Sequence, residues 1–159
     1  MNALTLLRKD HREIKRLLKE LEPSTQVLDA SGEVSKRRDL FEQIRRLLTV
    51  HEVIEEEIFY PTLKQHPKAK EIVLEGIEEH DVVNTIMGEL EGMPYDDETW
   101  GAKAKVMSEN VEHHIEEEEE EMFDKAEQVL EDRELEDLGK VMAERKDEAL
   151  KQEAAGQLR

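Results

Sequence analysis

The sequence predicts an all-α protein: an antiparallel up-down four-helix bundle with an additional C-terminal helix. Apolar residues recur at alternating steps of three and four over four long segments, which is the spacing of one face of an α-helix. Turn residues separate these segments, and seven Gly, four Pro and few aromatic residues disfavour a β-rich fold. Short connections between long helices favour antiparallel neighbours.

The first three predicted helices each place a histidine on the apolar face. The first helix covers about residues 3–22, and Pro23 ends it. The second runs from about 34 to 60, before Pro61, and the third covers about 68–91. Their histidines are His11, His51 and His80.

The fourth predicted helix begins near Glu98 and continues to about Leu130, with His114 on its apolar face. Residues 131–159 are expected to form a fifth helix with a thin apolar stripe, which docks weakly or frays. The sequence therefore predicts a four-helix bundle over residues 1–130 and a C-terminal helical extension over residues 131–159.

The composition argues against several classes of protein. Lys and Arg number 23 and Asp and Glu number 41, so the formal net charge is −18. A chain this acidic repels nucleic-acid phosphates and anionic membrane surfaces. No apolar run reaches the roughly 18 residues of a membrane span, and charge comes too early for a signal peptide, so we expect a cytoplasmic protein. The absence of cysteine excludes disulfides, thiolate metal sites and cysteine nucleophiles.

Weak internal repetition indicates two helical hairpins built on one plan. Residues 10–22 and 79–91 match at an offset of 69, with a histidine near the start and Glu-Leu-Glu at the end. Residues 51–60 and 114–123 match at an offset of 63. Each hairpin thus carries one histidine and then a His-x-x-x-Glu pair.

The spacing predicts that these polar residues meet inside the bundle. Residues four apart share one helix face, so His51 points with Glu55 and His114 with Glu118. Helix lengths place the histidines of antiparallel neighbours at similar heights. The candidate site is therefore His11, His51, Glu55, His80, His114 and Glu118.

Six buried polar side chains of these types favour a metal site. Each unsatisfied buried polar group costs roughly 1–3 kcal/mol, so six of them approach the whole stability of such a domain. Imidazoles and carboxylates are ligands for iron, manganese and zinc. One ion rarely takes six bulky protein ligands, so two ions that share both carboxylates fit better. Such a pair keeps open positions for a small ligand.

Other polar residues have simpler interpretations. A lone histidine on an apolar face is more often a hydrogen-bonded core residue than a ligand. His66, beside two prolines, is expected in a surface loop, and His113 at the rim of the bundle. Most of the run Glu116 to Glu121 is expected to face solvent.

The candidate residues resemble the hemerythrin family, in particular hemerythrin-like HHE cation-binding domains. The resemblance covers about residues 4–130 and rests on Asp10-His11, the segment from His51 to Pro61, Glu79-His80 and the segment from His114 to Glu118. It implies a non-haem di-iron centre. By position, the implied terminal ligands are His11, His51, His80 and His114, and the implied bridges are Glu55 and Glu118.

The chain departs from the respiratory members of that family at two places. They have a second third-helix histidine where this chain has Asn84, and their fourth-helix carboxylate corresponds to Glu119 rather than Glu118. We expect Asn84 to hydrogen-bond behind the ligands, while Glu52 could partly replace the missing histidine. A further open position suits oxygen or iron sensing, peroxide removal, nitric-oxide handling or iron sequestration better than reversible oxygen carriage.

Two alternatives to a di-iron protein stay open. One is a non-catalytic acidic bundle that binds a protein partner, and the other is the same site filled with zinc or manganese. A ferritin-like ferroxidase is disfavoured because no histidine of the chain lies three residues after a glutamate. Whether the protein is an enzyme is left open, and the expected partner is a small ligand such as dioxygen, peroxide or nitric oxide.

Overall fold

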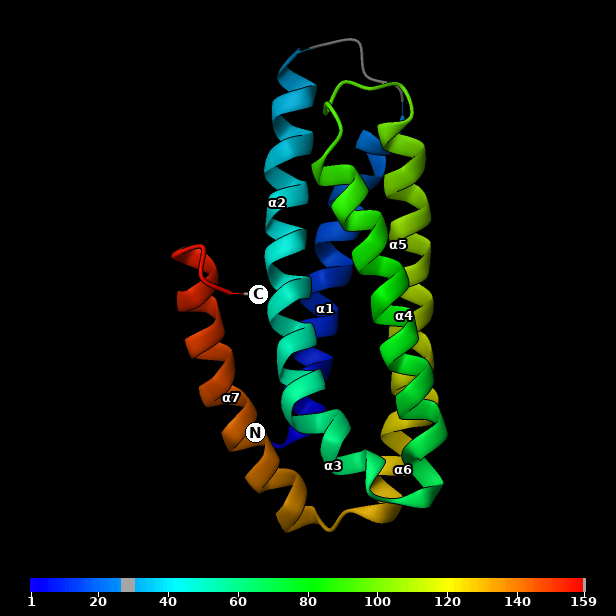
Figure 1. The fold of residues 1–159 in the computed structure, drawn as a ribbon, viewed down its shortest axis with the longest axis vertical. Coiled ribbons are helices and arrows are strands. Elements are labelled where there is room, and N and C mark those ends of the chain that lie inside the picture. Colours follow the sequence, from blue (N-terminus) through cyan, green and yellow to red (C-terminus); the bar gives the residue numbers. More distant parts are fainter. Residues whose placement is uncertain (27–30, 159) are drawn as a thin grey trace.

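The computed structural model describes residues 1–26 and 31–158, and in these ranges it contains helices and turns but no strand (Figure 1). The predicted all-α bundle with an additional C-terminal helix is confirmed. The α-helices are α1 (Ala3–Leu21), α2 (Ser31–Ile54), α3 (Tyr60–Lys64), α4 (Pro67–Glu91), α5 (Trp100–Glu117), α6 (Phe123–Val129) and α7 (Asp132–Ala154). A short 3₁₀ helix, η1 (Glu22–Thr25), follows α1.

The second and fourth helices of the bundle each contain one π-helical turn. These turns are η2 (Glu55–Phe59), between α2 and α3, and η3 (Glu118–Met122), between α5 and α6. The second predicted helix therefore continues past Pro61 instead of ending at residue 60. A proline normally clashes with the carbonyl group one turn before it, and the wider π turn relieves that clash.

The apolar core has two halves with a polar layer between them. One half lies at the end of the bundle with α3 and α6, and includes Leu7, Phe59, Leu63 and Phe123. The other half lies toward the opposite end and includes Ile14, Phe41, Trp100 and Met107. His11 lies between the two groups of apolar residues that α1 contributes, so the candidate site is enclosed by apolar side chains above and below.

Helix α7 packs against α1 and α2 along one side of the bundle (Figure 1). It begins with a capping box in which Glu131 and Glu134 satisfy each other's backbone N–H groups. Leu135, Met142 and Ala149 are buried over its length, so the structure shows a docked helix and not the frayed one expected from the thin stripe. No described helix is both long and apolar enough to cross a membrane.

Candidate metal centre

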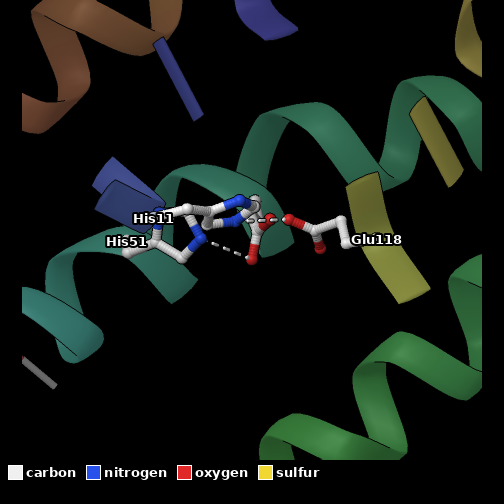
Figure 2. Close-up of side chains that lie close together, drawn as sticks. His11, His51 and Glu118 are labelled. Carbon is white, nitrogen blue, oxygen red and sulfur yellow. Dashed lines mark hydrogen bonds and ion pairs between the residues drawn. The ribbon is translucent and has the colours of Figure 1, made fainter. Parts of the chain in front are cut away.

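The structure brings the six predicted side chains together in the middle of the bundle. All six residues are at most 7% exposed. The imidazoles of His11 and His51 lie close together, with ring centres 4.9 Å apart, and the Glu118 carboxylate approaches His11 from η3 (Figure 2). On the other side of the cluster, the rings of His80 and His114 are 4.7 Å apart.

Each imidazole turns its Nε2 atom toward one of the two central carboxylates. Glu118 receives His11 and His114, at 3.0 and 3.2 Å. Glu55 receives His80 and His51, at 3.1 and 3.3 Å. At metal–ligand distances of about 2.1 Å, two donors at right angles around one ion are about 3 Å apart. The separations are therefore compatible with shared ions.

The Nδ1 atom of each histidine meets a second carboxylate, outside the central pair. The four contacts are His11–Glu119 at 2.6 Å, His51–Asp10 at 3.0 Å, His80–Glu56 at 2.8 Å and His114–Glu79 at 2.7 Å. An ionised carboxylate only accepts, so each Nδ1–H donates. In a neutral imidazole this leaves the lone pair on Nε2, facing the centre, as metal ligation requires.

The contacts follow the internal repeat of the sequence. Asp10, which precedes the histidine of α1, pairs with the histidine of α2, and Glu79 makes the corresponding contact to His114. Glu56 and Glu119, which each follow a central glutamate, pair with the histidines of the opposite hairpin. The cluster thus consists of two similar halves, which we call the His11/His51 subsite and the His80/His114 subsite.

The two subsites differ in one aromatic residue. Tyr60 and Phe123 correspond at the offset of 63, and each ring stacks on a histidine. The Tyr60 hydroxyl donates to Glu118 Oε2 at 2.6 Å and lies 3.3 and 3.4 Å from the Nε2 atoms of His80 and His114. Phe123 brings no such group to His11. The His80/His114 subsite therefore has an additional oxygen.

Two of the buried atoms that lack a hydrogen-bond partner lie at the centre of the cluster, and a cation would satisfy both of them. Among the described residues, His51 Nε2 and Glu55 Oε2 are buried without a hydrogen bond. The Nε2 atoms of His80 and His114 face each other at 3.2 Å, which requires a proton or a cation between them. Of the groups of donors among the described residues that lie close enough to hold an ion, two consist only of the six predicted residues: one combines His11, His51, Glu55 and Glu118, and the other combines Glu55, His80 and His114. The donor set fits metal binding.

The excess of carboxylates controls ionisation in the absence of a cation. Burial alone would lower the pKa of His80, but its hydrogen bonds to Glu55 and Glu56 raise that pKa to about 9. The pKa values of His51 and His114 also lie well above their usual range, because neighbouring carboxylates outweigh burial. Burial raises the pKa of Glu118, yet hydrogen bonds from its partners hold it well below the usual value. In the metal-free protein, protons on these histidines therefore balance the negative charge of the carboxylates, as metal ions would when bound.

The structure also shows where the residues lie whose roles the sequence left open. Glu118 lies in the centre, whereas Glu119 contacts only the outer edge of the His11 ring. Asn84 donates to Glu52 at 2.8 Å, behind the histidines, as expected for a supporting hydrogen bond. Burial raises the pKa of Glu52 to about 7. His113 is exposed and pairs with Glu117 at 3.1 Å, away from the centre.

A small cavity adjoins the cluster. Its volume is about 20 Å³, enough for about one water-sized molecule. His51, Glu52, His80 and His114 line it together with five apolar residues: Ile14, Leu48, Val83, Val111 and Ile115. Tyr60 and the outer carboxylates were not among the predicted site residues. The repeat could have indicated Tyr60, since it follows the His-x-x-x-Glu pair at the position of Phe123.

Comparison with known proteins agrees with this geometry. The family model of the hemerythrin HHE cation binding domain matches residues 2–126. A solved protein from Mycobacterium kansasii, described as hemerythrin HHE cation binding domain-containing, is 26% identical with a TM-score of 0.78, over 94% of this chain and 88% of that one. A search of curated proteins gave no significant match. Because the family match covers most of its length, the chain belongs to the hemerythrin HHE cation-binding domain family.

Proposed function

We propose that this protein binds two non-haem iron ions and presents them to one small ligand such as dioxygen, peroxide or nitric oxide. The ligands would be the four central histidines, with Glu55 and Glu118 between the ions. The observation that carries the proposal is the buried set of two histidine pairs around two shared carboxylates, with orphaned atoms at its centre. Iron in such a centre supplies open coordination positions and one-electron redox chemistry.

The residues of the chain restrict what can reach the ions. Apolar side chains line most of the 20 Å³ cavity, so it favours a diatomic molecule over a larger or charged substrate. The outer carboxylates Asp10, Glu56, Glu79 and Glu119 fix each imidazole ring and its tautomer. These features support sensing or handling of a small ligand. A cytoplasmic location stays a prediction.

Metal analysis of the purified protein tests this function. We expect about two irons per chain after expression in iron-replete cells, and an absorption spectrum that changes on exposure to air, peroxide or nitric oxide. Zinc or manganese at the same stoichiometry, with no iron, would keep the site but replace its chemistry. Protein that stays free of metal even when reconstituted would contradict the proposal.

A double variant separates metal binding from a purely structural cluster. His51→Ala with His114→Ala removes one ligand from each subsite. We expect this variant to lose most of its metal and to lose the increase in Tm that metal gives the wild-type protein. Unchanged metal content and an unchanged Tm would instead favour a non-catalytic acidic bundle that binds a protein partner.

A further inference from the structure

Helix α7 reaches the candidate centre through one side chain. Lys146 Nζ lies 2.5 Å from Oδ1 of Asp10, and Oδ2 of the same carboxylate lies 3.0 Å from Nδ1 of His51. Asp10 is only 8% exposed and the Lys146 side chain is 25% exposed, so this ion pair is partly shielded from water. A cation on α7 is therefore connected to a proposed metal ligand on α2 through one carboxylate on α1.

The repeat supplies an internal comparison for this contact. Glu79 holds His114 as Asp10 holds His51, but no described Lys or Arg forms an ion pair with Glu79. Glu56 and Glu119 also have no Lys or Arg partner among the described residues. Lys146 thus places a positive charge behind one of the four imidazoles. It comes from a helix beyond residue 126, where the family match ends.

A cation on the outer carboxylate weakens the donor in front of it. A free carboxylate pushes negative charge toward the imidazole to which it is hydrogen-bonded, and this strengthens the bond from Nε2 to a metal. Lys146 draws that charge away and adds its own repulsion toward a cation at the centre. At the other subsite, the Tyr60 hydroxyl adds an oxygen instead.

We infer that Lys146 makes the His11/His51 subsite the weaker of the two metal subsites, so that its ion is the one released first. The inference rests on the proposed function, because it requires two bound ions. Lys146 is a tuning residue that acts through Asp10 and touches no ion. Its side chain borders a cleft of about 430 Å³ between α1, α2 and α7, so a shorter or apolar side chain fits without overpacking.

Metal-release kinetics with Lys146→Met test the inference. The protein is loaded anaerobically with iron(II), and the loss of each ion to an excess of chelator is followed. We expect two phases in the wild-type protein, and in Lys146→Met the faster phase should slow by roughly three- to tenfold, with the slower phase unchanged. Lys146→Arg, which keeps the charge, should restore the wild-type rates.

The neighbouring residue provides a control matched in charge and helix. Arg145 pairs with Glu57 at 3.0 Å, and Glu57 contacts no histidine among the described residues. Arg145→Met removes the same charge from α7 and should leave both phases unchanged.

An equal effect in both variants would show that Lys146 acts only through the net charge of the protein. Faster release in Lys146→Met would show that Lys146 only holds the structure of the site together. Either result, or no change, overturns the inference while leaving the proposed function intact if the wild type holds two ions. A wild type that holds none would overturn both.

Discussion

Glu118 and Glu119 follow each other in the chain but contact opposite edges of the same imidazole. Glu118 lies within 3.0 Å of His11 Nε2 at the centre, and Glu119 within 2.6 Å of Nδ1 outside it. Glu118→Gln should therefore reduce the iron content to one ion per chain or fewer, because a shared charge is lost. Glu119→Gln should keep two ions with roughly tenfold weaker binding. Metal analysis and chelator competition measure both effects, and an equal loss in the two variants would contradict this assignment.

Tyr60 is not one of the predicted ligands, and in the metal-free protein its raised pKa favours the neutral phenol. Burial and the charges of Glu118 and Glu55 raise the pKa of Tyr60 well above its usual value. A cation at the His80/His114 subsite would reverse this balance and favour the phenolate.

We therefore expect the iron-loaded protein to show a phenolate-to-iron absorption band that Tyr60→Phe loses. The iron content should stay at two, and the metal-free variant should be destabilised by about 1 kcal/mol, because one buried hydrogen bond is lost. The matched control is Tyr95→Phe, since Tyr95 is the second of the two tyrosines and lies away from the cluster. The band should persist in Tyr95→Phe, and a band that survives in Tyr60→Phe would contradict a role for Tyr60.

The six central residues could be predicted from helix faces and helix lengths, whereas the outer contacts between helices could not. The apolar stripes, interrupted by histidines, indicated which side chains would face inward. The outer contacts join residues as far as 108 positions apart, and no local spacing encodes them. Glu119 illustrates the difference: the glutamate run left its role ambiguous, and only the packing of α1 against η3 places it on the outer edge of His11.

At the scale of elements, both π turns begin at a central glutamate. The N–H of Tyr60 bonds to the Glu55 carbonyl, and the N–H of Phe123 bonds to the Glu118 carbonyl, each five residues back. One additional residue in the turn changes which side chains face inward after it, and so brings Tyr60 and Phe123 onto the histidines. Apolar periodicity cannot reveal such a turn, because a shift of one residue falls within the width of a helix stripe.

The docking of α7 depends on a close backbone contact at Gly139. A Cβ atom there would lie 2.2 Å from the Met1 carbonyl oxygen and 2.7 Å from the Asn2 carbonyl carbon. Gly139→Ala should therefore lower the free energy of unfolding by about 1–3 kcal/mol. Gly88→Ala is the control: nothing lies within 4 Å of its Cβ, so it should raise the free energy of unfolding by about 0.5–1 kcal/mol. Chemical denaturation compares the two, and stabilisation by both would show that α7 does not need this contact.

At the scale of the whole molecule, negative charge is concentrated both inside and outside. The chain carries a net charge of −18, and two of its carboxylates lie at the centre of the bundle. Four further carboxylates contact the four imidazoles from outside. A fold with this arrangement is stabilised by whatever positive charge enters the centre, whether protons or metal ions. Composition could not reveal this, since most surface glutamates of such a chain simply face water.

The metal-free protein should therefore lose stability as pH rises. His80 has a pKa of about 9 in the folded protein, against 6.5 for an unperturbed histidine. A pKa raised by folding contributes stability that is fully present below about pH 6.5 and is lost as pH rises through about 9. The contribution of His80 alone is about 3 kcal/mol, which corresponds to a fall in Tm of roughly 6–12 °C. Thermal denaturation of metal-free protein across this range measures the fall, and His80→Gln should remove the part of the slope that His80 contributes. The iron-loaded protein should show little of this decline, because metal binding has already displaced the protons. A Tm of the metal-free protein that stays constant or rises from pH 6.5 to 9 would show that protons do not compensate the central carboxylates.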